Sequence, residues 1–412
     1  MSLTFKIVAK NTIFLSVSQG VARIIGFLYF IFLARILGVA EFGVYAFTIA
    51  FVYNFIPVAD FGIERLVLRD ISRFPEKPPL YFSKLLPARV ALSFLAYFLM
   101  IFLGIILNLS LKQILYLSFF GLALFPYGLI FLYTSFLNAR EKMEYMAGAN
   151  IALIVLTALF GGIFAFLRLN LGFILLAYPL SNLILLLYFL LNSQKLGLPL
   201  SADFDKTFIK KTLKECWPFG FILILAVFYL RITVVVLGLL KGSAATGIYS
   251  SSYKFIEAGI LVPQSLALAL FPASSRLFLN DKKKLKSLYF KSVGVLLVLG
   301  ILTALSFQLF SKMIIEVFYG IDYAAAVPAM KILGISFIFF FANAVAGNII
   351  QNSTRVKQFL PLAAFNFIFT LILACFLINN FSFIGAAWAV VGGEVVGLVI
   401  NNLYVHRILN ED

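Results

Sequence analysis

Charge is scarce in this sequence. Only 12% of its 412 residues are Asp, Glu, Lys or Arg. Soluble globular domains have about a quarter of their residues charged, because charged side chains cover the water-exposed surface. Hydrophobic residues make up 63% of the chain. The composition excludes a water-soluble globular protein and predicts a membrane protein.

Cysteine and histidine are also rare. The two cysteines, Cys216 and Cys375, lie far apart in or near apolar runs, and His406 is the only histidine. This spacing disfavours a disulfide framework or a Cys/His metal site. The sequence also lacks an Asp-rich metal motif, a nucleotide-binding glycine loop and a P-loop. We therefore expect no bound metal, no organic cofactor and no ATP hydrolysis.

Long apolar runs, in contrast, are abundant. At 1.5 Å per helical residue, a run of about twenty residues matches the ~30 Å hydrocarbon core of a bilayer. We predict an all-α integral membrane protein with twelve transmembrane helices. The first run lacks a small-residue cleavage site, so we expect no removable signal peptide. The expected spans are residues 11–37, 40–62, 85–107, 113–138, 145–167, 171–191, 215–240, 243–273, 286–308, 324–350, 356–379 and 383–408.

Positive charge alternates between the expected loops. If the N-terminus is cytoplasmic, the inward segments contain 23 of the 33 Lys and Arg residues, and the outward loops contain four. The positive-inside rule then predicts a multi-pass protein of the cytoplasmic (inner) membrane with both termini in the cytoplasm. The run "DKKKLK", residues 281–286, is interpreted as a topology signal near anionic lipid and not as a nucleic-acid site.

The two halves of the chain repeat each other. An offset of 204 residues aligns Gly43 with Gly247 and Tyr45 with Tyr249. Six spans in each half give both halves the same topology, which is typical of transporters with a substrate site between the halves. We expect an N-lobe over residues 1–192, a cytoplasmic linker over 193–214 and a C-lobe over 215–412.

Three segments carry a family resemblance. They are "ARIIGFLYFIFLARILGVAEFGVYAF" (residues 22–47), "DFGIERLVLRDISR" (60–73) and "IGAAWAVVGGE" (384–394). They resemble Wzx-type polysaccharide or O-antigen (oligosaccharidyl-lipid) flippases of the multidrug/oligosaccharidyl-lipid/polysaccharide exporter superfamily. The resemblance implies two parallel six-helix lobes in a V around a cationic central cavity. It also implies a monomer that flips a polyprenyl-diphosphate-linked oligosaccharide by alternating access driven by an H⁺ or Na⁺ gradient.

Two related classes remain as alternatives. Lipid II flippases usually have further C-terminal spans and an Arg-Asp pair in the first helix, where this chain has Tyr29 and Phe30. Cation-coupled multidrug exporters of the same fold usually have an acidic residue in the first helix, and this chain has none there. A membrane-embedded glycan polymerase or ligase is a third alternative. Such enzymes place catalytic residues in large outer loops. The expected outer loops of this chain are short, so we expect a transporter and not an enzyme.

Six cations fall inside the expected spans, where a charge costs about 2.5–3.5 kcal/mol on insertion scales. Arg89 lies near a span end, from which its side chain can extend to the interface, and Lys331 is similar. Arg23 and Arg231 lie near mid-span and are related through the repeat. Guanidinium groups contact diphosphate oxygens in a bidentate manner. We predict that Arg23, Arg231, Lys254 and Arg35 bind the diphosphate. Two alternatives remain open: Lys254 could instead pair with Glu257, and Arg35, near a span end and close to Glu41, could be an interface anchor or part of a gate salt bridge.

Three acids are candidates for ion coupling or for charge balance. Glu394 lies mid-span with Asn401 two turns further on, Glu257 follows Lys254, and Asp60 lies near a span end. A buried carboxylate can take up a proton or bind a cation together with neighbouring oxygens. The same carboxylate could simply neutralise an arginine, and the sequence leaves both interpretations open.

Overall fold

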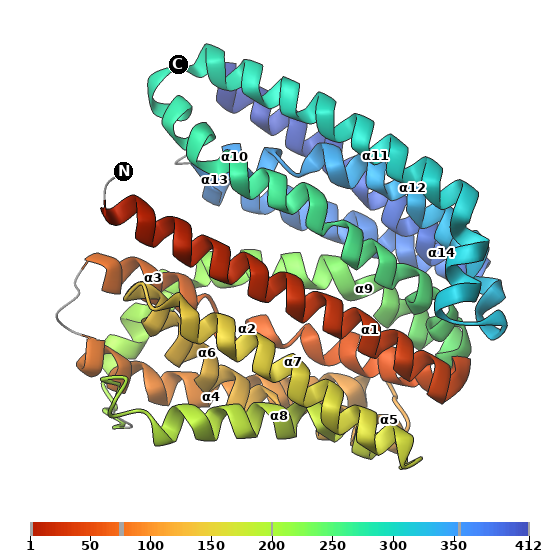
Figure 1. Cartoon of the computed structure of the whole chain (residues 1–412), viewed down its shortest axis with the longest axis horizontal. Coiled ribbons are helices and arrows are strands. Elements are labelled where there is room, and N and C mark those ends of the chain that lie inside the picture. Colours follow the sequence, from red (N-terminus) through yellow and green to blue (C-terminus); the bar gives the residue numbers. More distant parts are fainter. Residues whose placement is uncertain (1–2, 74–77, 199–200, 353–355, 411–412) are drawn as a thin grey trace. The chain divides into compact units, whose positions relative to one another are not determined.

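The computed structural model describes residues 3–73, 78–198, 201–352 and 356–410, and these residues contain helices and no strand (Figure 1). The helices are α1 (Leu3–Tyr53), α2 (Ile56–Asp60), α3 (Ile63–Arg73), α4 (Pro78–Ile106), α5 (Leu111–Gly121), α6 (Leu124–Ala139), α7 (Met143–Phe166), α8 (Leu171–Leu191), α9 (Lys206–Gly259), α10 (Leu261–Asn280), α11 (Lys282–Phe318), α12 (Val327–Asn343), α13 (Ala346–Asn352) and α14 (Val356–Asn410). A 3₁₀ helix, η1, covers Ile321–Ala326.

Nine segments of the described residues are long and apolar enough to cross a membrane. Three of them include the long helices α1, α9 and α14, each of which contains one non-helical residue: Gly38, Gly242 and Ser382. These residues lie at three of the expected boundaries between consecutive spans. The all-helical membrane fold is therefore confirmed, and the count of twelve spans stays a prediction.

Contacts within the described chain form two compact units. The first contains residues 1–36 and 48–227, and the second contains residues 37–47 and 228–412. The lobes expected from the repeat stay a prediction, and the contact-based units are drawn along different boundaries in two places. The segment 37–47 packs with the second half, and the division within α9 falls between Val227 and Phe228 instead of in the segment 193–214.

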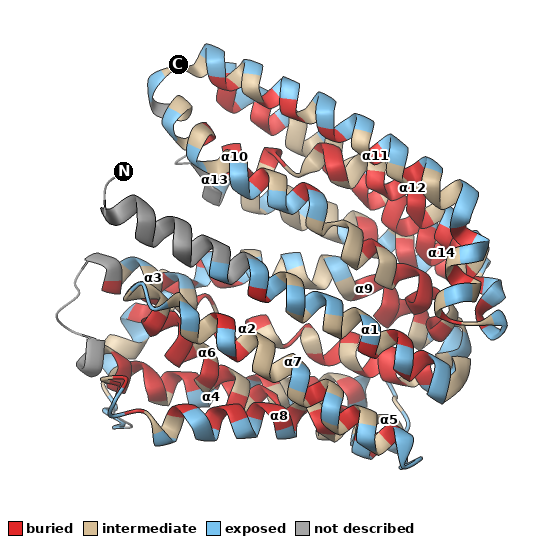
Figure 2. Ribbon diagram, in the orientation of Figure 1, coloured by how far each residue is buried: buried red, intermediate tan, exposed pale blue. Residues whose placement is uncertain are grey.

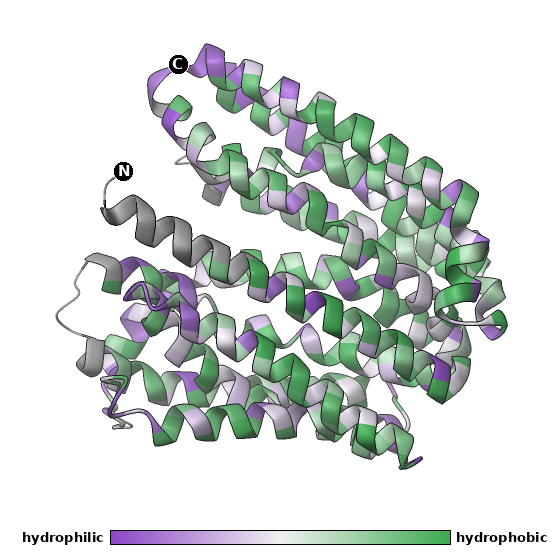
Figure 3. Ribbon diagram, in the orientation of Figure 1, coloured by the Kyte–Doolittle hydropathy of each residue, from purple (hydrophilic) through white to green (hydrophobic). Residues whose placement is uncertain are grey.

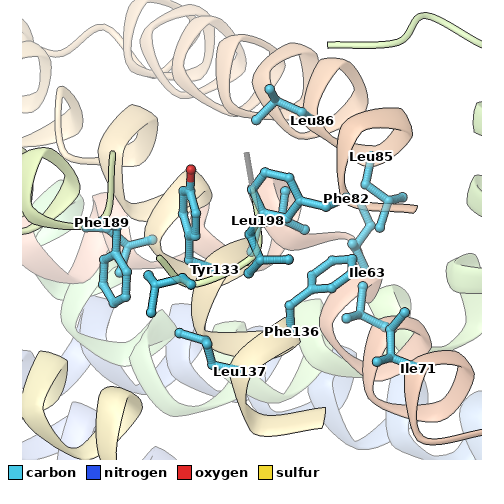
Figure 4. Close-up of a cluster of buried hydrophobic side chains, with 14 of the residues drawn as sticks. Ile63, Ile71, Phe82, Leu85, Leu86, Tyr133, Phe136, Leu137, Phe189 and Leu198 are labelled. Atoms are coloured by element: carbon cyan, nitrogen blue, oxygen red, sulfur yellow. The ribbon is translucent and has the colours of Figure 1, made fainter. Parts of the chain in front are cut away.

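The core of the first unit is a cluster of aromatic and branched side chains (Figure 4). Phe82 of α4 packs against Tyr133 and Phe136 of α6, with ring centroids 4.8 and 5.3 Å apart. Phe189 of α8 stacks on Tyr133 at 5.5 Å. Offset and edge-to-face aromatic pairs at these distances contribute beyond the apolar area that they bury. The cluster fixes α4, α6 and α8 against one another.

The outward faces of the helices are apolar. Figure 2 shows exposed residues along α11, and Figure 3 shows that most of the same helix is hydrophobic. Val298, Leu302, Leu305 and Leu309 form an exposed stripe at helical spacing on α11. In water such a surface would cause aggregation, whereas hydrocarbon chains solvate it. Together with the nine apolar helices, this surface identifies a multi-pass membrane protein.

A reciprocal glycine contact joins the two hairpin turns of the second unit. Gly38 and Gly242, which are 204 residues apart, both have positive φ and extended ψ (69°, 172° and 80°, −173°). A Cβ on Gly43 would collide with the carbonyl of Ser243, and a Cβ on Gly247 would collide with the carbonyl of Val39. Ser243 is the repeat partner of Val39. The contact is therefore symmetric under the same 204-residue offset, and glycine permits the close backbone approach.

Candidate functional site

Two cations of the second unit share one carboxylate. The Nη1 atom of Arg231 lies 3.4 Å from Oε1 of Glu257, and Nζ of Lys254 lies 2.8 Å from Oε2. All three side chains lie on α9, on opposite sides of the break at Gly242. Their side chains are about one-quarter exposed (25%, 25% and 27%). The chain reversal after Gly242 brings Glu257 back to the level of Arg231.

This trio keeps an excess of positive charge. Two cations and one carboxylate sum to a net charge of +1. An arginine has five N–H donors and a lysine has three, so the two side chains together can donate to several acceptors besides Glu257. Donors held together at a partly buried position can bind an anion more strongly than they could in water. The pairing with Glu257, which the sequence left as one alternative for Lys254, also includes Arg231.

Glu394 lies in a separate polar cluster of the same unit. Its carboxylate accepts hydrogen bonds from the Tyr229 hydroxyl at 2.6 Å and from Nδ2 of Asn343 at 3.3 Å. Nδ2 of Asn401 donates to Oδ1 of Asn343 at 3.1 Å. Glu394 is only 4% exposed. Helices α9, α12 and α14 thus supply a neutral hydrogen-bonded shell around one buried acid.

This cluster lines a cavity of about 300 Å³. The polar lining residues are Tyr229, Gln264, Asn343, Asn366, Glu394 and Asn401. The Oδ1 atom of Asn366 is buried and has no hydrogen-bond partner. Carboxylate, amide and hydroxyl oxygens are the ligands that hard cations prefer. The cavity could therefore hold a small cation, or Glu394 could take up a proton there.

The cation trio and the Glu394 cavity adjoin each other. Leu230, the neighbour of Arg231, lines the cavity, and the Tyr253 hydroxyl donates to the Leu230 carbonyl at 2.7 Å. Tyr253 is buried, and the charges of Arg231, Glu257 and Glu394 all act on it. Tyr253 therefore connects Glu394, by electrostatic interaction, with the segment of α9 that contains Arg231.

Asp60 is part of a buried ion pair in the first unit. The Arg89 guanidinium lies 2.6 Å from Oδ1 of Asp60, and it also donates to the carbonyls of Gly128 at 2.8 Å and Ala59 at 3.0 Å. Arg89 is 1% exposed. The expectation that its side chain extends to the membrane interface is therefore wrong, because the carboxylate and two carbonyls satisfy it inside the protein.

The remaining candidate cations lie at exposed positions. Arg23 and Arg35 are exposed residues of α1 in the first unit, and Lys331 is an exposed residue of α12. The structure brings Arg231, Lys254 and Glu257 together. It places Glu394 and Asp60 in separate clusters. Joint action of Arg23 and Arg231 on one group stays a prediction.

Sequence reasoning missed the partners of the charged residues. Tyr229 and Asn343 bind Glu394 from positions 165 and 51 residues away. Neutral polar residues in apolar helices have no periodic signal that would point to a distant partner. The position of Asn401, two turns beyond Glu394 on one helix, was the only part of this cluster that spacing could show.

Two family models match the chain. The model for "Polysaccharide biosynthesis protein" covers residues 8–278, and the MatE model covers residues 218–376. An uncharacterised membrane protein of Methanocaldococcus jannaschii is 30% identical over 161 residues. The matched region covers 36% of this chain and 30% of that relative, so this chain matches about a third of the length of the relative.

Solved structures share the fold at low sequence identity. The lipid II flippase MurJ in an inward closed conformation has a TM-score of 0.77 at 16% identity, covering 96% of this chain and 87% of MurJ. An inward-facing multidrug resistance MATE transporter of the MOP superfamily has a TM-score of 0.72 at 13% identity and covers 94% of both chains. A MOP superfamily transporter from Pyrococcus furiosus has a TM-score of 0.66 at 14% identity and covers 98% and 97%.

The matched family model, the helical membrane fold and the structural relatives all agree. The family model extends over well more than half of the chain, and the fold is that of MOP-superfamily transporters. The chain belongs to the family described as "Polysaccharide biosynthesis protein".

Proposed function

We propose that this protein flips a polyprenyl-diphosphate-linked oligosaccharide across the cytoplasmic membrane by alternating access. The observation that carries the proposal is the clustering of two cations, Arg231 and Lys254, around one carboxylate, Glu257, within an apolar span. A net positive charge costs free energy in a membrane unless an anion or water compensates it. A diphosphate provides that anion, and its oxygens match the guanidinium geometry.

The charge of the trio also separates the alternatives. A multidrug exporter for cationic compounds needs a site that attracts cations, and the trio repels them. A lipid II-type flippase would bind the same diphosphate, so the trio alone does not distinguish it from an oligosaccharide flippase. Tyr29 and Phe30, where lipid II flippases usually have an Arg-Asp pair, favour the oligosaccharide.

The four proposed binding cations have different roles. Arg231 and Lys254 bind the diphosphate when their contacts with Glu257 open. The sequence also assigns diphosphate binding to Arg23 and Arg35 of α1, and this assignment stays a prediction. Glu257 balances the site when no cargo is bound, so the empty site carries less uncompensated charge in the membrane.

Ion coupling is assigned to the Glu394 cavity. An H⁺ or Na⁺ entering from the outer side neutralises Glu394, and its hydrogen bonds with Tyr229 and Asn343 rearrange. Because Tyr229 is two residues from Arg231 on α9, this rearrangement can alter how α9 presents the cation trio. In this proposal the protein is a monomer with both termini in the cytoplasm, and it transports its cargo without a chemical reaction.

The test is flipping of a defined lipid-linked oligosaccharide in proteoliposomes, with lipid II as a second substrate. We expect Arg231→Ala to reduce flipping at least about tenfold, because it removes charge-assisted hydrogen bonds of 1.5–3 kcal/mol each. Arg231→Lys should keep part of the activity, since it restores charge without bidentate geometry. Lys331→Ala, which removes an exposed cation on α12, is the matched control. Normal flipping by a folded Arg231→Ala variant would contradict the proposal.

Glu394→Gln tests the coupling. The amide keeps the size of the side chain and removes its charge. The variant should therefore still flip the lipid-linked oligosaccharide down the concentration gradient of that substrate, but flipping should no longer respond to an imposed ion gradient. Separate H⁺ and Na⁺ gradients identify the ion. A Gln variant that still responds fully to the same gradient as the native protein would exclude Glu394 from coupling.

A further inference from the structure

The N-terminal part of α9 carries a stripe of lysines that continues into aromatic residues. Lys206, Lys210, Lys214, Trp217 and Phe221 are separated by four, four, three and four residues, so they lie on one face of the helix. All five are exposed, and Trp217 and Phe221 are each 47% exposed. We call this face the basic–aromatic stripe.

The opposite face of the same helix is fixed to the first unit. Thr212 and Cys216 are buried, with exposed fractions of 4% and 0%, and Phe208 packs on the hydrophobic core. The Phe208 ring contacts the ring of Tyr81 at a centroid distance of 5.1 Å. The rotation of the helix is therefore set, and the basic–aromatic stripe points away from the unit.

The acids beside the stripe are already neutralised by other residues. Asp205 pairs with Lys84 at 2.8 Å, and Glu215 pairs with Arg69 at 2.8 Å. Both partner cations belong to α3 or α4 and not to the stripe. The three lysines of the stripe therefore keep their charge available for an external anion.

The order of residues along the stripe matches a membrane interface. Tryptophan and tyrosine are enriched at the level of the lipid headgroups, where their amphipathic rings contact both lipid and water. Lys214, Lys210 and Lys206 lie about 4.5, 10.5 and 16.5 Å beyond Trp217 along the helix axis, at 1.5 Å per residue. This range covers the headgroup phosphates, and the apolar part of α9 continues on the other side of Trp217.

We propose that the basic–aromatic stripe is a binding surface for anionic phospholipid headgroups, with Trp217 at the glycerol level and the lysines on the phosphates. The topology proposed above places it at the cytoplasmic leaflet. A juxtamembrane lysine gains about 1 kcal/mol near an anionic surface, which corresponds to about fivefold in affinity. The surface serves any anionic bilayer lipid and does not depend on the identity of the transported cargo.

Trp217 provides a local measurement. The chain has two tryptophans, so Trp388→Phe leaves Trp217 as the only one. The full-length variant is reconstituted in equal parts of phosphatidylcholine and phosphatidylglycerol, with brominated, fluorescence-quenching chains on one lipid or on the other. We expect brominated phosphatidylglycerol to quench Trp217 more strongly, and we expect this preference to weaken at high salt.

Matched variants locate the effect. Replacing Lys206, Lys210 and Lys214 together with Gln should make quenching by the two brominated lipids equal, whereas the triple Arg variant should keep the preference. Replacing Lys282, Lys283 and Lys286 with Gln removes the same charge from α11 and should leave Trp217 quenching unchanged. Equal quenching in the native stripe, or a preference that survives its Gln variant, would overturn the proposal.

Discussion

Single residues of this protein carry charges that the apolar core must compensate. Arg89 shows how this is achieved, because Asp60 and the carbonyls of Gly128 and Ala59 occupy its donors. Asp60 also accepts from the backbone N–H of Gly62 at 3.1 Å, next to a positive-φ turn. One carboxylate therefore fixes both a buried guanidinium and the break between α2 and α3.

The first prediction concerns this buried pair. Arg89→Ala leaves the Asp60 carboxylate buried without its counter-ion, and breaking a buried pair in this way costs about 3–5 kcal/mol. We expect a clear fall in the thermal unfolding midpoint of the purified protein. The double variant Arg89→Ala/Asp60→Asn should recover part of the loss, because Asn keeps an acceptor for Gly62 and carries no charge. A double variant that is no more stable than Arg89→Ala would contradict this account.

The second prediction concerns pH and Asp205, in the segment before α9. The Lys84 side chain and the backbone N–H of Phe208 both bond its carboxylate and lower its pKa from the usual value. A lowered folded-state pKa adds stability above the unfolded value of about 3.9, and this stability is lost as the pH falls through the folded value. Asp205→Asn should therefore melt below the native protein at pH 7, and the difference should narrow at pH 3–4. If the difference in melting temperature between the two proteins did not depend on pH, the charge of the Asp205 carboxylate would be excluded as its cause.

At the level of whole elements, the break in each long helix determines which segments meet. Gly38 and Gly242 turn α1 and α9 at equivalent points of the repeat, and the following residues then meet at Gly43 and Gly247. Phe42 in the first turn also contacts Tyr319 and Tyr323 at 6.4 and 6.0 Å. These contacts explain why residues 37–47 pack with the second half of the chain.

The third prediction concerns the glycine contact. A methyl group on Gly43 would collide with the Ser243 carbonyl, so Gly43→Ala should force the turns apart. Overpacking of this kind costs about 1–3 kcal/mol, and thermal unfolding should report it. Gly294→Ala on α11 is the control, since nothing lies within 4 Å of its added methyl. Equal melting of both variants would show that the turns can adjust.

At the scale of the whole molecule, charge in the loops sets the orientation. The fourth prediction is that residues 276–286 are cytoplasmic and residues 241–243 face outward. Cys216 and Cys375 are first replaced by Ser, and single cysteines are then labelled in intact cells with an impermeant thiol reagent. Lys241→Cys should react, and Lys283→Cys should react only after the membrane is permeabilised. Labelling of Lys283→Cys in intact cells would reverse the proposed orientation.

The sequence by itself determined the class of the protein and its repeat. Hydrophobicity and loop charge are sums over neighbouring residues, so runs of apolar residues specify membrane helices without knowledge of tertiary contacts. The breaks at Gly38 and Gly242 lie at the expected boundaries for the same reason, because glycine between two apolar runs is a local signal. The choice of Arg231, Lys254 and Glu394 as candidate site residues also followed from the free-energy cost of an isolated charge in an apolar helix.

Only the tertiary structure decided the partners of those charges. Arg231 is 26 residues from Glu257, Arg89 is 29 from Asp60, and Glu394 is 165 from Tyr229. These pairs form because separate helices, or the two arms of the broken helix α9, pack side by side. A polar group in a low-dielectric interior then binds whichever partner that packing brings near. Arg89 was misjudged for this reason: its distance from a helix end is a local property, but its burial depends on α2 and α6 packing around it.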